Sequence, residues 1–486
     1  MTAHPGTTRT GTAHSGTAQP GTTHPETASV DREALGGPVV RAALVLAAGA
    51  FVALLDTTVV GVALESFARR FDAGLAQVQW VATAYLLAMS AVIPATGWAA
   101  RRFGAVACWT ASLAVFLLGS ALSGLAWSLG SLVAFRVVQG LGAGMLFPLM
   151  RILVVQVAGP QRMGRTMALI AVPILLAPVA GPVVGGALVQ GHSWRWMFLL
   201  NVPVCLVVAV LSPLLMRNQR DSDPGGLDLA GLVTVSGGLT AAVLGCVRLG
   251  GGRAAGDPGV LVPLLVAAAL LATHGVLARR RRRRALLDFG LFRDRAFAAS
   301  TSVSLLNSFG LYGAVVLVPL FFQQAGGRGP LAAGLAMTAQ GAGAGVAVLL
   351  VGRVIDARSN PRALVLTGLA LVAAGLAVFA RAGSAEPGPL LLGALFAQGV
   401  GLALAASPVM VTLYHSLPPA SVPAATTANA VAQQLGAAVG TAVVALVLEH
   451  GDAGTVGAFR VAFAVALGFV VLTAIPAAFL PAKRRA

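Results

Sequence analysis

The sequence has very little charge. Only 10% of its 486 residues are Asp, Glu, Lys or Arg, and Lys483 is the single lysine. Soluble proteins carry about 25% charged residues. Hydrophobic residues make up 57% of the chain, and the mean hydropathy is +0.85. A chain of this composition must place most of its residues in lipid, which excludes an ordinary soluble enzyme or binding domain.

Cysteines and the patterns of nucleotide binding and catalysis are also scarce. The three cysteines, Cys108, Cys205 and Cys246, all fall in apolar segments, so we expect free, buried thiols and no disulfide framework. The chain has no GxxxxGK[ST] sequence, so ATP is not expected as the energy source. It also shows no nucleophile–base–acid set and no cluster of metal ligands. We therefore expect neither enzymatic activity nor a bound cofactor.

The net charge of +17 does not indicate a nucleic-acid partner. The basic residues are spread between apolar segments, which is the pattern of the positive-inside rule. Residues 1–40 are rich in Gly, Thr, Ala and Pro and contain too few apolar residues to form a core, so we expect a disordered cytoplasmic tail. Since the first apolar run begins only after this tail, no cleavable signal sequence is expected.

After the tail, the chain is a series of apolar runs that are each long enough to cross a bilayer, which takes roughly 17–25 residues. The predicted spans are 42–64, 76–98, 104–126, 131–153, 166–188, 196–216, 228–248, 258–278, 297–322, 331–352, 363–382, 389–413, 424–447 and 458–480. The expected count is fourteen. Twelve or thirteen stays open, because uncharged spans run together between Gly388 and Leu448.

The distribution of basic residues favours an even number of spans with both termini in the cytoplasm. The loops expected inside contain Arg101, Arg102, Arg162, Arg165, Arg217, Arg220, Arg279–Arg284, Arg353, Arg358, Arg362 and Lys483–Arg485. The loops expected outside contain fewer, among them Arg195, Arg253, Arg328 and Arg381. Losing one span would invert every later loop and remove this asymmetry. The bias toward Arg, Ala and Gly further indicates a bacterial source, and hence a bacterial cell membrane.

The spans divide into two sets of six around a pair of extra helices. We predict a first six-helix bundle over 41–216, a linker with two inserted helices over 217–285, and a second six-helix bundle with a short basic tail over 286–486. Transporters built from repeated halves have this layout, and their substrate site lies between the halves near the bilayer midplane. The composition therefore predicts an all-α integral membrane protein of the transporter class.

Asp56 is the most informative residue of the chain. It lies in the otherwise apolar first span, and a charge near the bilayer centre costs roughly 2.5–3.5 kcal/mol on insertion scales. Such residues usually mark an ion or substrate pathway. We therefore interpret Asp56 as a group that takes up and releases a proton. The alternative is an acid that only completes a packed polar cluster.

Four segments carry a family resemblance. They are Leu55–Leu64 around Asp56, Gly97–Gly104, Arg136–Gly144 with the sequence RVVQGLGAG, and Ala177–Gly186 with the sequence APVAGPVVGG. Together they resemble motifs of the major facilitator superfamily, specifically its fourteen-span drug:proton antiporter branch. The resemblance covers about residues 42–482. It implies the major facilitator fold, with two six-helix bundles plus a two-helix insert, and a proton-coupling partnership between Asp56 and Arg136.

The resemblance also assigns residues to conformational change. These are Gly97, Arg102, Gly104, Gly140, Gly181, Pro182, Gly185, Gly186 and Asp356. In the Gly97–Gly104 loop, Arg101 stands where the family usually has Asp, so the acidic half of this motif is missing. The pattern recurs at Gly352–Asp356, where the acid is kept. Small residues in the span-four and span-five motifs would let helices approach closely and pivot.

Polar residues within the spans are candidates for the wall of a substrate cavity. They are Thr57, Tyr85, Gln139, Asn307, Tyr312, Gln340, Asn429 and Gln433. Each of them alone is more often an interhelical hydrogen bond. The expected function is proton-coupled export of amphiphilic small molecules such as drugs or antibiotics by a monomer in the lipid bilayer. Two alternatives stay open: transport of a specific endogenous metabolite in either direction, and a membrane sensor that transports nothing.

Overall fold

The structure is a computed structural model, and it describes residues 36–191, 193–221, 226–280, 289–354, 360–415, 417–418, 421–450 and 455–482. All regular secondary structure in these ranges is helical, as predicted. The α-helices are α1 (Gly37–Phe71), α2 (Leu75–Val78), α3 (Trp80–Val92), α4 (Thr96–Phe103), α5 (Ala105–Gly124), α6 (Leu129–Gly191), α7 (Arg195–Leu199), α8 (Asn201–Leu215), α9 (Leu229–Gly250), α10 (Pro258–Arg280), α11 (Arg295–Leu320), α12 (Pro330–Val354), α13 (Pro361–Ala380), α14 (Pro389–His415), α15 (Val422–His450) and α16 (Val456–Ala478).

Each predicted span is helical over most of its length, although the second and the sixth each comprise more than one helix. Eleven helical segments of the described chain are long and apolar enough to cross a membrane. The predicted spans 166–188, 297–322 and 331–352 are helical as well but are not among these eleven. The structure is thus compatible with fourteen crossings, and the number itself stays a prediction. The second span, predicted as one helix, is α3 and α4 joined by a 3₁₀ turn at Ile93–Ala95, since Pro94 has no backbone N–H to continue the helical ladder.

The longest helix, α6, is two helices joined at Gly159. An unbroken helix of this length would run about 95 Å, roughly three times the thickness of the bilayer core. Gly159 has φ 68 and ψ 171, a conformation that glycine adopts without steric cost, and it separates Leu129–Ala158 from the part that ends at Gly191. The sequence predicted a loop between spans four and five, whereas the observed connection is a single non-helical residue.

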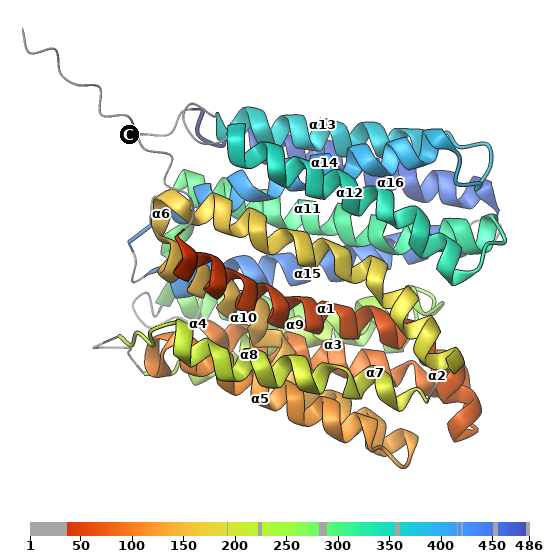
Figure 1. The fold of residues 1–486 in the computed structure, drawn as a ribbon, viewed down its shortest axis with the longest axis horizontal. Coiled ribbons are helices and arrows are strands. Elements are labelled where there is room, and N and C mark those ends of the chain that lie inside the picture. Colours follow the sequence, from red (N-terminus) through yellow and green to blue (C-terminus); the bar gives the residue numbers. More distant parts are fainter. Residues whose placement is uncertain are drawn as a thin grey trace, which may run out of the picture.

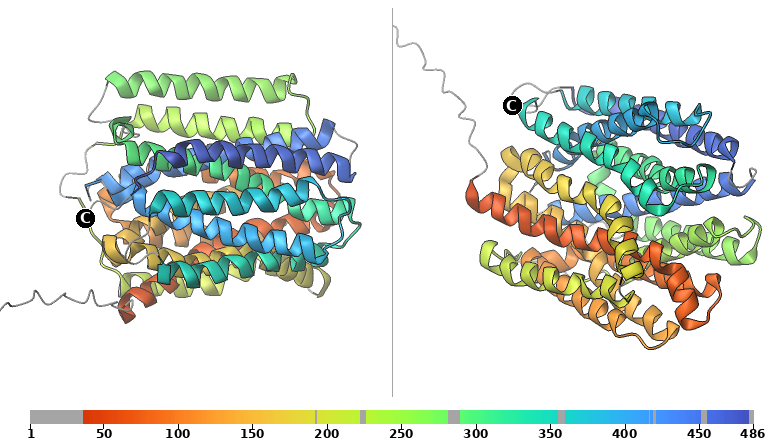
Figure 2. Two further views of the ribbon diagram at one scale, coloured as in Figure 1. Left: turned by 90° about the horizontal axis from the view of Figure 1, so that it is seen from above. Right: turned by 45° about the vertical axis from the view of Figure 1, so that its right-hand side comes forward.

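The helices form two halves with an insert at one side (Figure 1). Helices α1, α3, α5, α6 and α8 pack together in one half, and α11 to α16 pack together in the other. The insert reaches both halves, because α9 contacts α3 and α15. Helix α10 packs mainly on α9 and forms the outermost layer (left view of Figure 2). The domain limits at residues 216 and 285 stay a prediction.

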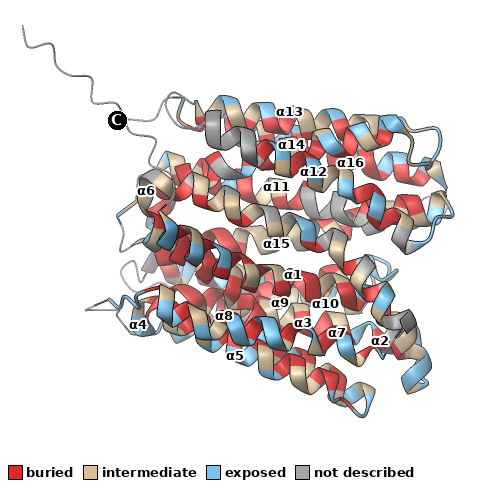
Figure 3. Ribbon diagram, in the orientation of Figure 1, coloured by how far each residue is buried: buried red, intermediate tan, exposed pale blue. Residues whose placement is uncertain are grey.

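The outer faces of the bundle are apolar. Figure 3 shows exposed residues on the outward sides of α5 and α8, and these include large hydrophobic side chains. Examples are Val115, Leu118, Leu206, Val207 and Leu214. A soluble protein rarely exposes so many large apolar residues side by side. The surface is therefore suited to lipid, in agreement with the low charge of the sequence.

A short repeat shows that the two halves share one packing pattern. The sequence Gln-Gly-x-Gly occurs at Gln139–Gly142 in α6 and again at Gln398–Gly401 in α14. A Cβ on Gly142 would meet Ser112 O of α5, and a Cβ on Gly401 would meet Gly368 O of α13. Each glutamine likewise abuts a glycine of the neighbouring helix. The motif thus permits the same close helix contact in both halves.

A buried apolar cluster joins the two halves at one end of the bundle. One buried cluster combines Ala99 of α4 and Leu153 of α6 with Leu413 of α14 and Ala425 of α15. We call this end of the bundle the closed end. Toward the other end, the buried clusters are separate for each half: one is built around Phe198 and the other around residues of α11 to α16. This difference leaves room between the halves away from the closed end.

Candidate functional site

Asp56 of α1 forms a buried ion pair with Arg136 of α6. Arg136 Nη1 lies 2.5 Å from Asp56 Oδ2, although the residues are 80 positions apart in the sequence. Only 3% of Asp56 and 1% of Arg136 are exposed. The two side chains meet because α1 packs along α6. Since one of these charges buried alone would be strongly destabilising, each side chain requires the other.

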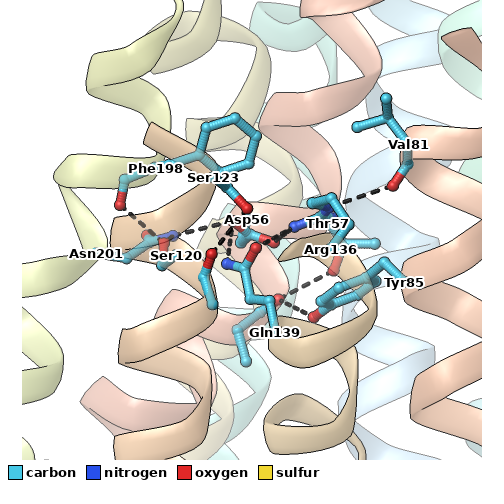
Figure 4. Close-up of polar contacts among 12 residues, drawn as sticks. Asp56, Thr57, Val81, Tyr85, Ser120, Ser123, Arg136, Gln139, Phe198 and Asn201 are labelled. Carbon is cyan, nitrogen blue, oxygen red and sulfur yellow. Dashed lines mark hydrogen bonds and ion pairs between the residues drawn. The ribbon is translucent and has the colours of Figure 1, made fainter. Parts of the chain in front are cut away.

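Two amide side chains complete the surroundings of the carboxylate (Figure 4). Gln139 Nε2 and Asn201 Nδ2 each donate a hydrogen bond to Asp56 Oδ1 over 2.9 Å. Gln139 Oε1 accepts from Arg136 Nη1 at 2.7 Å, and Asn201 Nδ2 also donates to Ser120 Oγ at 3.0 Å. Asp56 therefore faces three donor contacts. An ionised carboxylate only accepts hydrogen bonds, so this arrangement suits the charged form of Asp56.

Tyr85 connects the ion pair to the space between the halves. The guanidinium carbon of Arg136 lies 4.0 Å from the centroid of the Tyr85 ring, which is a cation–π contact. Arg136 Nε donates to Val81 O at 3.2 Å, and the Tyr85 hydroxyl donates to Ala53 O at 3.4 Å. Tyr85 and Thr57 both line the large cavity between the halves. The ion pair thus lies directly behind the cavity wall.

The cavity between the halves has a volume of about 920 Å³. Pockets for drug-sized ligands range from about 300 to 1,000 Å³. Its wall includes residues of both halves and of α9, from Arg151 and Met410 toward the closed end to Gly250 and Leu448 near the opposite end. Most of this wall is apolar, and the polar residues on it are amides, hydroxyls and Arg151. The cavity can therefore hold an amphiphilic molecule of moderate size.

The predicted cavity residues have three different outcomes. Thr57, Tyr85, Asn307, Gln340 and Gln433 line the cavity. Gln139 does not, because it lies one helical turn from Arg136 and turns its amide to the ion pair. Asn429 is fully buried away from the cavity wall, and neither atom of its amide has a hydrogen-bond partner within the described structure. Tyr312 belongs to α11, but its side chain lies outside the described part of the chain.

Three of the predicted glycines allow close contact between helices. A Cβ at Gly97 would lie 2.6 Å from Thr427 Oγ1, so Gly97 lets α4 of one half approach α15 of the other. A Cβ at Gly140 would lie 2.5 Å from Tyr85 O, which brings α6 against α3. A Cβ at Gly181 would overlap the Thr58 hydroxyl of α1. These positions therefore tolerate only glycine without a shift of the helices.

The turn after α4 is bound by the linker that follows α8. Gly104 has φ 90, and a Cβ there would overlap the Asn218 amide. Asn218 Nδ2 donates to Phe103 O at 2.9 Å, and Asn218 Oδ1 accepts from Ala107 N at 3.1 Å. The backbone N–H of Asp221 donates to Arg101 O at 3.0 Å. The linker thus fixes the turn in which the usual acid is replaced by arginine.

The remaining motif residues are less informative. Arg102 is exposed at the end of α4, and Gly185 is buried in α6. Pro182 and Gly186 belong to α6, but their contacts lie outside the described structure, as does all of Asp356.

Asn201, Ser120 and Arg151 belong to the site but were not predicted as site residues. Asn201 stands next to Pro203 in a family-like stretch, and a polar amide within an apolar run was the available signal. Ser120 gave no comparable signal, because single serines are common in membrane helices. Arg151 resembles a basic residue near a span end, and only the fold shows that it lines the cavity.

We expect Gly181→Leu to impair transport while the protein still inserts into the membrane. The leucine would overlap Thr58, and overpacking of this kind costs typically 1–3 kcal/mol and shifts the helices apart. Gly61→Leu is the matched control, since Gly61 is exposed on α1 and a Cβ there meets nothing within 4 Å. Dye transport and membrane protein level would be measured for both variants. Wild-type transport by Gly181→Leu would show that this contact is incidental.

Known proteins resemble this chain in sequence and in fold. Residues 46–327 and 300–486 match the family model described as Major Facilitator Superfamily. A Multidrug resistance protein B homolog of Mycobacterium tuberculosis is 34% identical, covering 92% of this chain and 91% of the relative. A putative multidrug resistance protein MdtD of Pectobacterium carotovorum is 28% identical, covering 89% of this chain and 93% of the relative.

Two solved structures share the fold at low sequence identity. The human organic anion transporter MFSD10 (TETRAN) aligns with a TM-score of 0.63 at 15% identity, over 90% of this chain and 99% of that protein. The proton:xylose symporter XylE aligns with a TM-score of 0.63 at 15% identity, over 91% of this chain and 95% of that protein. At this identity the likeness concerns the fold alone.

Proposed function

Because this chain belongs to the major facilitator superfamily of membrane transporters, we propose that it is a proton-coupled exporter of amphiphilic small molecules. It is a multi-pass membrane protein and a transporter, not an enzyme. To this the proposal adds three points: the proton as the driving ion, export as the direction of transport, and alternating access as the mechanism. The observation that carries it is the buried Asp56–Arg136 pair directly behind the wall of a drug-sized cavity.

The contacts of Asp56 support a role in binding a proton. In the present conformation the carboxyl group accepts hydrogen bonds from Arg136, Gln139 and Asn201. A proton on Asp56 would cancel the charge that Arg136 faces and weaken this contact. The two protonation states of Asp56 thus favour different positions of α1 relative to α6. Such a difference in interaction between two states is what couples an ion to a conformational change.

Tyr85 provides the physical connection between proton and substrate. Its ring stacks on Arg136 on one side and lines the cavity on the other. A substrate that displaces this ring changes the position of Arg136, and protonation of Asp56 in turn changes the position of the ring. Both ligands therefore act on one side chain, and the binding of one alters the affinity for the other.

The difference in packing between the two ends of the bundle supports alternating access. The halves are joined by a buried cluster at the closed end, and Gly97 brings α4 against α15 there. With the basic loops in the cytoplasm, as the positive-inside rule indicates, the closed end is cytoplasmic. The present conformation would then be the one in which the cavity is closed to the cytoplasm. Rocking of the halves about the cavity would open the cytoplasmic end and close the opposite end.

The energetics permit this coupling. One proton that crosses 100 mV releases about 2.3 kcal/mol, and each 1.4 kcal/mol corresponds to a tenfold ratio of concentrations. One proton per cycle can therefore sustain a gradient of some tens-fold. No nucleotide is required.

Everted membrane vesicles test the proposal. We expect that an imposed pH gradient, acid inside, drives amphiphilic dyes into vesicles that contain the protein, and that a protonophore abolishes this uptake. Vesicles without the protein are the control, and anionic, neutral and cationic dyes should all be tried. If no dye of any charge type moves in response to the gradient, the protein is not a proton-coupled exporter of amphiphiles.

A further inference from the structure

The charge of the cavity wall has one sign. Among the described residues that line the cavity, Arg151 of α6 is the single formally charged side chain, and none is acidic. Asp56 does not line the cavity, because it lies behind Tyr85 and is paired with Arg136. The pair as a whole is neutral. The single charged group that the described lining residues present to a ligand is therefore the guanidinium of Arg151.

Arg151 lies where a ligand would reach it. It is on the first part of α6, two turns before the break at Gly159, and lines the part of the cavity toward the closed end. The side chain is partly buried and also interacts with the surrounding protein. The argument requires only its charge and its place on the wall. In a site of low polarity such a charge attracts an anion and opposes a cation more strongly than it would in water.

The other polar groups of the wall suit the same type of ligand. Asn307, Gln324, Gln340, Gln433 and Gln434 provide amide N–H donors as well as acceptors. The apolar part of the wall includes five methionines, whose flexible side chains adapt to different shapes. These are Met89, Met150, Met167, Met337 and Met410. The wall thus offers an adaptable apolar surface to the hydrophobic part of a ligand and one positively charged side chain to its polar group.

We infer that the cavity selects amphiphiles with a negatively charged group, such as a carboxylate, sulfonate or phenolate, and that Arg151 binds this group. The inference names the class of compound for the exporter proposed above and rests on that proposal for its meaning in transport. Binding itself depends only on the cavity. Arg151 is then the residue that determines charge specificity, whereas Asp56 and Arg136 carry the proton.

Two probes with one scaffold test the inference. 1-Anilinonaphthalene-8-sulfonate carries a sulfonate, and N-phenyl-1-naphthylamine is the same bicyclic amine without it. Binding of each would be measured by calorimetry on the full chain in nanodiscs, with ethidium as the cation. We expect the sulfonate to bind at least tenfold more tightly than the neutral probe, a difference of about 1.4 kcal/mol, and ethidium to bind more weakly than either.

Variants of Arg151 locate the effect. Arg151→Gln should bind the two naphthyl probes equally, and Arg151→Lys should keep most of the preference because the charge remains. Arg253→Gln is the control, since it removes the same charge from an exposed side chain that does not line the cavity. Thermal unfolding would show that each variant is folded. If wild type binds ethidium as tightly as the sulfonate, or if Arg151→Gln keeps the preference, the inference is wrong.

The binding experiment separates this inference from the proposed function. A preference for the sulfonate in a protein that moves no dye under a pH gradient would overturn proton-coupled export but keep the charge selectivity. If instead all three probes are transported at similar rates under a pH gradient and none is bound preferentially, proton-coupled export is supported and the charge selectivity is wrong. In proteoliposomes, transport of the sulfonate should also respond more strongly to membrane potential than transport of the neutral probe, because its own charge crosses the membrane.

Discussion

Asp56→Asn is expected to abolish pH-driven efflux while leaving the protein in the membrane. The asparagine has nearly the shape of aspartate but cannot exchange a proton near neutral pH, so the protonation step is lost. It also leaves Arg136 without its counter-ion and turns an amide N–H₂ toward the donors of Arg136, Gln139 or Asn201. We therefore expect a lower unfolding temperature in addition to the loss of transport, because an uncompensated buried charge costs roughly 3–5 kcal/mol.

Asp56→Glu shows whether transport depends on the presence of a carboxyl group or also on the exact size of the side chain. It keeps a carboxyl but adds one methylene to a site that is 97% enclosed, so we expect partial activity and some loss of stability. The measurements are dye efflux under an imposed pH gradient, protein level in the membrane and thermal unfolding. Efflux by Asp56→Asn at the wild-type rate under a pH gradient would mean that another group carries the proton and that the mechanism is wrong.

Asp56 and Arg136 stood out in the sequence for separate reasons, and the family resemblance implied that they act as partners. Asp56 was conspicuous because a carboxylate in an apolar span is costly, and Arg136 because it lies in a recognisable motif. Their distance could not be predicted from composition, since it depends on how α1 packs along α6. Gln139 was predicted as a cavity residue because it is polar. Its true direction follows from the helical turn that separates it from Arg136.

Five of the eight residues predicted for the cavity wall line the cavity, and Asn429 shows why another does not. Asn429 and Gln433 are four residues apart on α15 and so lie on similar faces of that helix. Gln433 lines the cavity, whereas Asn429 is one turn nearer the closed end, where neighbouring Ala428 belongs to the buried cluster. Periodicity gives the face of a helix but not the level at which a cavity ends. Arg151 was missed for the same reason.

Local conformation explains the other differences. The chain reverses at Gly159 within a single residue, and a loop was expected because Arg162 and Arg165 follow closely. The missing acid at Arg101 suggested a weakened motif. The structure supplies other contacts there, because Asn218 and the Asp221 backbone bind the turn after α4. These contacts join residues more than 100 positions apart, which a reading of one local motif does not include.

Arg136→Ala is expected to have the second large effect, a loss of both coupling and stability. It would leave the Asp56 carboxyl group enclosed with two amide donors and no counter-ion, and it would remove the contact that protonation is proposed to weaken. It would also remove the stacking on Tyr85, which is the contact to the cavity. Arg136→Lys loses the planar geometry of the guanidinium but keeps the positive charge. Because Asp56 then still has a counter-ion, we expect this variant to retain more activity than Arg136→Ala.

The double variant Asp56→Asn with Arg136→Gln separates stability from coupling. It removes both charges at once, and replacing a buried ion pair by neutral groups is often close to neutral for stability. We therefore expect its unfolding temperature to recover above that of Arg136→Ala, whereas pH-driven efflux stays at the level of empty vesicles. A structural pair would behave differently, because efflux would return together with stability. Recovery of efflux in the double variant would thus contradict a role of the pair in proton coupling, since a site without a titrating group cannot carry the proton.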